Sequence, residues 1–194
     1  MRLLLSVCAV LGLAFSAGAR APAPVADAVI LSDGLPRLLS DYHFFRDASG
    51  WQPNDRVTPY RLNMPLFSDY AEKYRFLYVP EGEQAKARGD GLLDLPVGSA
   101  LIKSFGYEMD GKVRLLETRV LLHRADGWLA LPYVWDEAQT EAVLKVAGAR
   151  IPVTFTDPSG KQRSIDYGVP NKNQCKECHA LSGEVTPIGP KARN

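Results

Sequence analysis

Several residue types and patterns that mark common protein classes are scarce in this 194-residue chain. It has only three cysteines, and its formal net charge of +1 provides neither a basic surplus to attract nucleic acid or anionic membranes nor an acidic tail. No solenoid-type repeat, βαβ alternation or glycine-rich phosphate loop occurs, which argues against repeat proteins and nucleotide-binding enzymes. The remaining composition, 46% hydrophobic and 23% charged, predicts one globular domain, with or without an appendage.

The N-terminus has the pattern of a secretory signal peptide. Arg2 precedes an apolar run, residues 3–15, that is too short for a membrane span, and Ala17-Gly18-Ala19 fits the small-residue cleavage pattern. An uncleaved membrane anchor is the alternative. We therefore predict a signal peptide at residues 1–19, a flexible Ala/Pro-rich leader at 20–30, and a periplasmic protein without stable membrane insertion. Cleavage removes Cys8 and leaves two cysteines in an oxidising compartment.

The middle of the chain predicts a β-rich domain at residues 31–168. Residues 31–69 are rich in turn signals and aromatics, whereas residues 72–168 alternate large and polar side chains as antiparallel strands do. Asp110-Gly111 and Asp126-Gly127 are hairpin turn signals. After the strand at 128–135 we expect one helix at 136–147 with Asp136 as its N-cap, followed by a third hairpin that turns at residues 157–160.

Alternation also predicts which side chains share a face of these strands. Leu101, Lys103, Phe105 and Tyr107 should share one face of their strand. In the next strand one face should carry Leu116, Thr118, Val120 and Leu122, and the other should carry Glu117, Arg119, Leu121 and His123.

The C-terminal part carries the one motif that specifies chemistry. Cys175-Lys176-Glu177-Cys178-His179 is C-x-x-C-H, the attachment pattern of c-type haem. On a helical turn the two thiols lie on one side, where each can add to a vinyl group of the porphyrin, and His179 can reach the iron as proximal ligand. The motif uses both cysteines of the exported chain, and covalent haem attachment takes place outside the cytoplasm. We predict one covalent haem c, with Cys175, Cys178 and His179 as cofactor-binding residues and His179 as metal ligand.

Three other interpretations of the motif remain open. A redox dithiol would require a thioredoxin-like βαβ setting, which the sequence lacks. A structural zinc site would require two more ligands, and His43 and His123 are the only other histidines. A plain disulfide beside an incidental histidine is the third.

The chain resembles a family of exported bacterial c-type cytochromes, conserved hypothetical proteins with one or two haems and a β-rich N-terminal part. The resemblance covers residues 39–194 and rests on segments 44–47 (FFRD), 59–63 (PYRLN), 66–71 (LFSDYA), 95–103 (LPVGSALIK), 117–119 (ETR), 127–128 (GW), 132–135 (PYVW) and 170–175 (PNKNQC). It implies an α+β fold, mainly antiparallel β, followed by a short helical haem c segment at 169–194.

The residues after the motif resemble the loop of class I cytochromes c in which a Gly-Pro pair passes the haem edge. The resemblance implies that the Pro190 carbonyl accepts a hydrogen bond from the proximal imidazole, which makes Pro190 a further cofactor-binding residue. Class I cytochromes enclose their haem with further helices that supply the distal methionine. Few residues follow His179, so we expect an incomplete, C-terminally truncated cytochrome c-like domain.

The resemblance implies electron transfer with periplasmic redox partner proteins rather than catalysis. Candidates for a sixth iron ligand are Met64, Met109, His43 and His123, for each of which a structural role is the simpler interpretation. Two alternatives stand beside electron transfer. One is a five-coordinate haem sensor or peroxidase-like enzyme, and the other is a non-haem secreted binding domain with a C-x-x-C disulfide.

Overall fold

The computed structural model describes residues 21–181 and 183–193, and within them strands dominate. Strand residues make up 44% and helical residues 9% of the structure, and the sheets are antiparallel. The predicted signal peptide at 1–19, with its Cys8, lies outside the described residues.

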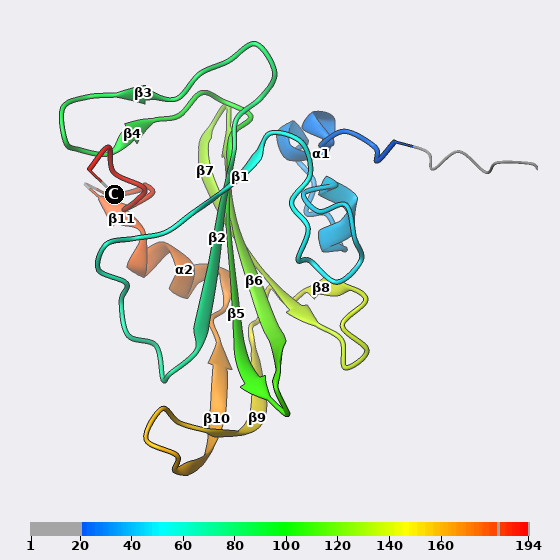
Figure 1. The fold of residues 1–194 in the computed structure, drawn as a ribbon. Helices are drawn as coiled ribbons and strands as arrows, with labels where there is room; N and C mark the ends of the chain where they lie inside the picture. The colour runs from blue at the N-terminus through cyan, green and yellow to red at the C-terminus, as the bar shows by residue number, and fades with distance from the viewer. Residues whose placement is uncertain (1–20, 182, 194) are drawn as a thin grey trace, which may run out of the picture.

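A six-stranded sheet, with strand order β1-β2-β5-β6-β7-β8, organises the fold (Figure 1). Its strands are β1 (Val57–Tyr60), β2 (Glu72–Tyr78), β5 (Ala100–Met109), β6 (Lys112–Arg124), β7 (Gly127–Trp135) and β8 (Ala142–Leu144). The predicted turn between β5 and β6 forms as expected. Asp110 and Gly111 both have positive φ, 52° and 74°, which is the requirement for a two-residue turn that matches the twist of the strands.

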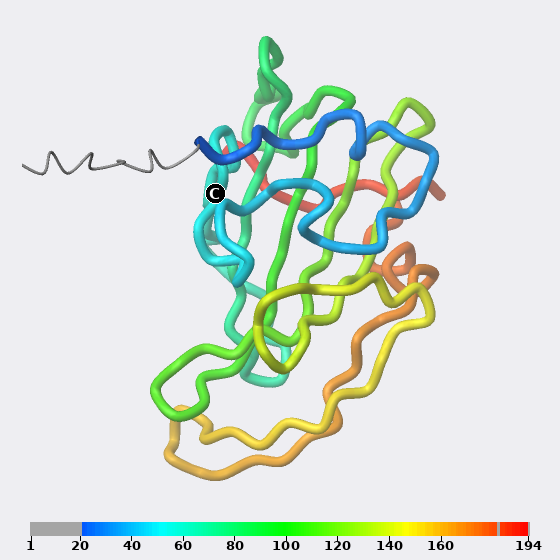
Figure 2. Tube along the Cα trace, turned by 90° about the vertical axis from the view of Figure 1, so that its right-hand side faces the viewer, coloured from blue at the N-terminus to red at the C-terminus, as the bar shows by residue number. Residues whose placement is uncertain are grey.

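Three strand pairs and three short helices complete the described chain. The pairs are β3 (Lys86–Ala87) with β4 (Leu93–Asp94), β9 (Ala149–Thr156) with β10 (Gln162–Val169), and β11 (Ala180–Leu181) with β12 (Glu184–Val185). The helices are α1 (Asp27–Leu31), the 3-10 helix η1 (Leu39–Tyr42) and α2 (Lys172–Cys178). Because α1 and η1 lie on one side of the large sheet and α2 on the other, both faces are covered (Figures 1 and 2).

The first side, here called the N-terminal face, packs against residues 25–45. Its core joins Val25, Ile30 and Tyr42 to the inward side chains of β2, β5, β6 and β7. Its buried polar groups are paired. Tyr42 Oη and Tyr133 Oη lie 2.9 Å apart, and Thr118 Oγ1 lies 2.8 Å from Ser104 Oγ and accepts from Trp135 Nε1 at 2.9 Å.

The second side, here called the motif face, carries three cross-strand rows. The first row pairs Leu77, Leu101, Leu121 and Ala130, the second pairs Tyr60, Arg75, Lys103, Arg119 and Pro132, and the third pairs Lys73, Phe105, Glu117 and Val134. Cys175 of α2 packs in the cluster of Leu101, Leu121 and Ala130. The hairpin β9–β10 packs on Phe105 through Val153, Phe155 and Tyr167. The second, charged row therefore lies between two apolar clusters.

The predicted helical haem c segment at 169–194 is wrong. The described residues of this segment, 169–181 and 183–193, hold one seven-residue helix, α2, followed by β11 and β12. The described fold is therefore mainly β and not α+β with a helical cytochrome c-like part. The helix is short because Ala180–Leu181 pairs back onto Glu184–Val185 directly after the motif.

The predicted helix at 136–147 is also wrong. Asp136 does act as a cap, because its carboxylate accepts from Thr140 N and Oγ1, both at 2.8 Å, but it closes a turn. The chain then continues into β8, which pairs with β7. Edge pairing for β8 outweighs the weak helical pattern that predicted the helix.

Residues 20–30, predicted to be a flexible leader, include structured core residues. Ile30 is fully buried in α1, and Val25 packs in the same cluster. The face assignment failed at one residue, Leu116. A bulge pairs Gly106 with Leu115 and Phe105 with Glu117, so Leu116 has no partner and packs on the motif face with Phe105.

Candidate functional site

Helix α2 begins directly before the motif because reciprocal side-chain hydrogen bonds cap its N-terminus. The Asn171 side chain accepts from the backbone N–H groups of Asn173 and Gln174, at 3.0 and 2.9 Å. The Gln174 side chain accepts in return from Asn171 N at 3.0 Å, which completes a capping box. The helix ends at Cys178, and His179 is its C-terminal cap residue. The local sequence thus places both cysteines on one helix.

The two thiols are free and lie in different surroundings. Cys175 is buried against the sheet, whereas Cys178 is exposed. Burial raises the pKa of the Cys175 thiol, and the opposing effect of Arg119 is smaller. A redox dithiol requires a thiol whose pKa is lowered, so this environment argues against that interpretation of the motif.

His179 is half-buried, and its Nδ1 atom is buried without a hydrogen-bond partner among the described residues. Burial lowers the pKa of the imidazole. The charges of Lys103 and Arg119 lower that pKa further, while a hydrogen bond with the Thr186 backbone opposes them. The ring is therefore held neutral, which is the protonation state in which histidine binds metals.

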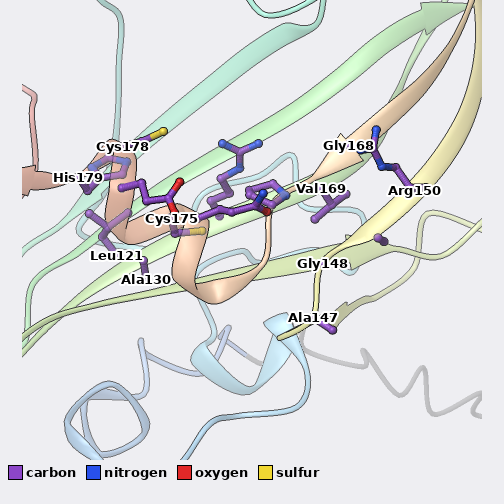
Figure 3. A pocket seen from close by; sticks show the side chains of 15 residues that line it. Leu121, Ala130, Ala147, Gly148, Arg150, Gly168, Val169, Cys175, Cys178 and His179 are labelled. Atoms are coloured by element: carbon purple, nitrogen blue, oxygen red, sulfur yellow. The ribbon is translucent and has the colours of Figure 1, made fainter.

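The motif lines a cavity of about 570 Å³. Its other walls are Arg119 and Leu121 of β6, Ala130 of β7, and the segments 147–150 and 168–170. Figure 3 shows Cys175, Cys178 and His179 at one end of the cavity and Gly148 and Arg150 at the other. The volume falls within the roughly 300–1,000 Å³ typical of cofactor and ligand pockets.

Pro190 lies elsewhere. Its ring lines a smaller cavity with His123 and Trp128, and its carbonyl accepts from Leu93 N at 3.4 Å. The structure therefore does not bring Pro190 into the cavity that His179 lines.

The four predicted sixth-ligand candidates do not line the His179 cavity either. Met64 is 89% exposed, and Met109 packs against the cluster of the β9–β10 hairpin. His43 is exposed at the end of η1, where its Nδ1 lies 3.0 Å from the Pro24 carbonyl oxygen. His123 stacks on Trp128, with ring centroids 4.4 Å apart, and its Nδ1 lies 2.9 Å from the Leu95 carbonyl oxygen.

Within residues 21–181 and 183–193, no group of three or more His, Cys, Asp or Glu side chains converges as a metal site would require. Cys175, Cys178 and His179 therefore do not meet at one point. In the same residues, no helix has the length and apolar character needed to cross a membrane.

The sequence analysis did not predict the group of charged side chains that lies beside the motif. Glu117 is fully buried, pairs with Arg119 and accepts from Tyr167 Oη at 2.7 Å. Lys103 and Arg75 continue from Arg119 along the same row. The sequence did contain a sign of this group, because Lys103 and Arg119 each lie two residues from an inward leucine, Leu101 or Leu121, and so face the same side of the sheet.

A comparison of the chain with protein-family models, with curated proteins and with solved structures gave no match.

Proposed function

We propose that this chain is an exported haem c-binding protein that transfers electrons in the periplasm. The observation that supports it best is the C-x-x-C-H motif, which ends at a neutral, half-buried His179 and lines a cofactor-sized cavity. The signal-like N-terminus and the resemblance to exported c-type cytochromes point the same way.

The residues present fit a covalently held haem. Both thiols are free for thioether formation, and they are separated along α2, as attachment to two substituents of one ring requires. Cys175 and Cys178 would hold the group, and His179 would be the axial ligand. When bound, haem c would supply a one-electron ferric/ferrous couple.

Side chains around the motif would control the access of water to the haem, the protonation state of its ligand and its reduction potential. Leu121 and Ala130 exclude water from the side of Cys175 that faces the sheet. Burial of His179 and the nearby positive charges keep its imidazole neutral, so its ring nitrogens can act as ligands without first losing a proton. The positive charges of Lys103 and Arg119 also favour the more reduced, less positive state of any redox group beside them.

The test is production of the full chain in a periplasm with a cytochrome c maturation system, followed by acid–acetone extraction. We expect visible colour to stay with the polypeptide and to be lost in Cys175→Ser/Cys178→Ser. His179→Ala should change the spectrum, whereas the control His43→Ala, at an exposed histidine on the N-terminal face, should not. Colourless wild-type protein would contradict the proposal and support a disulfide instead.

A five-coordinate haem sensor or peroxidase-like enzyme is a second candidate. It is favoured by the positions of Met64, Met109, His43 and His123, each of which is exposed or engaged away from the His179 cavity. A high-spin reduced spectrum that shifts with carbon monoxide would support this candidate. A low-spin reduced spectrum would support electron transfer with a sixth ligand.

A further inference from the structure

A row of three positive side chains crosses the motif face beside the candidate site. Arg75 of β2, Lys103 of β5 and Arg119 of β6 are direct cross-strand partners, so their side chains share one face at one level of the sheet. We call these three residues the cationic row. Arg119 lines the same cavity as Cys175, Cys178 and His179, which places this end of the row next to the motif.

The cationic row has too few negative partners among the described residues. In the part of the chain that the structure describes, Glu117 is the one carboxylate that forms an ion pair with the row, and its partner is Arg119. Arg75 is 8% exposed, yet its one hydrogen bond is a long contact of 3.5 Å from Nη1 to the Lys73 carbonyl. Lys103 makes no hydrogen bond or ion pair there. Burial lowers the pKa of Lys103 to about 8, and the neighbouring Arg75 and Arg119 add to this effect.

The other groups that face the row do not neutralise its excess positive charge. Phe105 offers its ring to Lys103 Nζ at 4.5 Å and to Arg119 Cζ at 4.4 Å, which stabilises the charges but accepts no conventional hydrogen bond. Tyr60 and Tyr167 are neutral near pH 7, because burial raises the pKa of both phenols. Lys73 adds another positive charge nearby.

In the described part of the chain, the buried arginine on the other face of the sheet has the hydrogen-bond partners that the cationic row lacks. Arg124, which is 7% exposed, lies on the N-terminal face and donates to two backbone carbonyls, of Ile30 and Gly34, both at 2.9 Å. A buried guanidinium is ordinarily satisfied in this way. On the motif face, Arg119 Nε is buried without a partner among the described residues, Arg75 makes one long hydrogen bond and Lys103 makes none. Planar guanidinium groups match carboxylates well.

We infer that the cationic row is a carboxylate-binding site, and that Arg75 and Lys103, with Arg119, receive the propionate carboxylates of the haem attached at Cys175 and Cys178. This inference rests on the proposed function for the source of the carboxylates. The cations are binding and positioning residues, and they take no part in covalent attachment.

The test compares full-length holoprotein with full-length apoprotein made without haem maturation. The variant is Arg75→Gln/Lys103→Gln, which leaves the pair of Glu117 and Arg119 intact. The control is Lys112→Gln, an exposed lysine at the start of β6. The probe is succinate, a dicarboxylate, compared with chloride at equal ionic strength, and the readout is the midpoint of thermal unfolding.

In the wild-type apoprotein we expect succinate to raise the unfolding midpoint by about 2–4 °C, the shift that corresponds to a modest gain in stability for a chain of this size. The variant should lose this response, and in chloride it should unfold at a higher temperature than the wild type because like charges no longer repel. Lys112→Gln should behave as the wild type. A wild-type apoprotein that does not respond to succinate would overturn the inference.

The holoprotein identifies the source of the carboxylates. We expect no succinate effect on the wild-type holoprotein, because its own propionates occupy the row, and we expect a lower midpoint potential in the variant holoprotein. Equal stabilisation of holoprotein and apoprotein by succinate would overturn the assignment to propionates and indicate a free carboxylate ligand. If the wild type carries no covalent haem, the proposed function fails, while the apoprotein arm still decides whether the row binds carboxylates.

Discussion

The two faces of the large sheet bury polar groups in opposite ways. On the N-terminal face, Tyr42, Tyr133 and Arg124 all have hydrogen-bond partners at ordinary distances. On the motif face, Glu117 Oε2, Arg119 Nε and His179 Nδ1 are buried without a partner in the described part of the chain. Buried groups in a purely structural core are normally satisfied, so the unsatisfied face is where a ligand is expected. The N-terminal face has a paired polar core, and the motif face carries the groups to which we assign ligand binding.

The largest change in stability should come from Glu117→Gln. This substitution leaves the partly buried Arg119, whose Nε atom is fully buried, without its carboxylate in a row that already has excess positive charge, which should cost about 3–5 kcal/mol in the free energy of unfolding. Urea unfolding of the apoprotein measures the effect. Glu117→Gln/Arg119→Gln should recover part of the loss, because the unpaired charge is gone. Unchanged stability in Glu117→Gln would show that the pair contributes nothing.

A substitution that creates a cavity in the core of the N-terminal face should lower stability without affecting the candidate site. Ile102 is fully buried in that core, so Ile102→Ala should lower the free energy of unfolding by about 2–5 kcal/mol. The loss should be equal in apoprotein and holoprotein, and the visible spectrum should not change. A spectral shift in Ile102→Ala would contradict the division of roles between the faces.

Arg124 and Arg75 are buried to a similar degree on opposite faces of the sheet, so their substitutions can be compared directly. Arg124→Gln leaves the carbonyls of Ile30 and Gly34 without a charged donor and should destabilise the apoprotein by about 1–3 kcal/mol. Arg75→Gln should cost nothing in the apoprotein, or stabilise it. Chemical denaturation of the two variants side by side provides the measurement, and equal losses would remove the distinction between the faces.

The smallest effect concerns pH and the loop of the β9–β10 hairpin. Hydrogen bonds from Ser159, and then the Arg163 guanidinium, hold the pKa of Asp157 well below its usual range. Since the folded-state pKa is the lower one, the stabilisation is complete above the unfolded pKa of about 4 and is lost as the pH falls below it. Amide protection factors in residues 157–163, which correct for the intrinsic slowing of exchange at low pH, should fall on acidification. Asp157→Asn should exchange faster at neutral pH and show less acid sensitivity.

Alternation and turn signals in the sequence predicted the central hairpins and the faces of β5. They failed where pairing between distant residues decides the structure. Residues 136–147 became a turn and an edge strand because β8 pairs with β7, and Leu116 changed face because of a bulge opposite Gly106. The helical haem c segment was expected from the resemblance, and the short strands β11 and β12 replaced it.

The candidate site was predicted only in part. Cys175, Cys178 and His179 follow from their spacing alone. Alternation places Lys103 and Arg119 on the inward face of their strands, but Arg75, Lys103 and Arg119 meet in one row only once the register of β2, β5 and β6 is fixed. Register depends on tertiary packing and turn geometry, which a local pattern does not contain.

The most direct test of the central claim is the intact mass of the exported protein purified under denaturing conditions. We predict the mass of the polypeptide plus one haem, and the mass of the polypeptide alone for Cys175→Ser/Cys178→Ser. A wild-type mass equal to the bare polypeptide, or lower by the two hydrogens lost on disulfide formation, would contradict the account and make the motif a structural thiol pair.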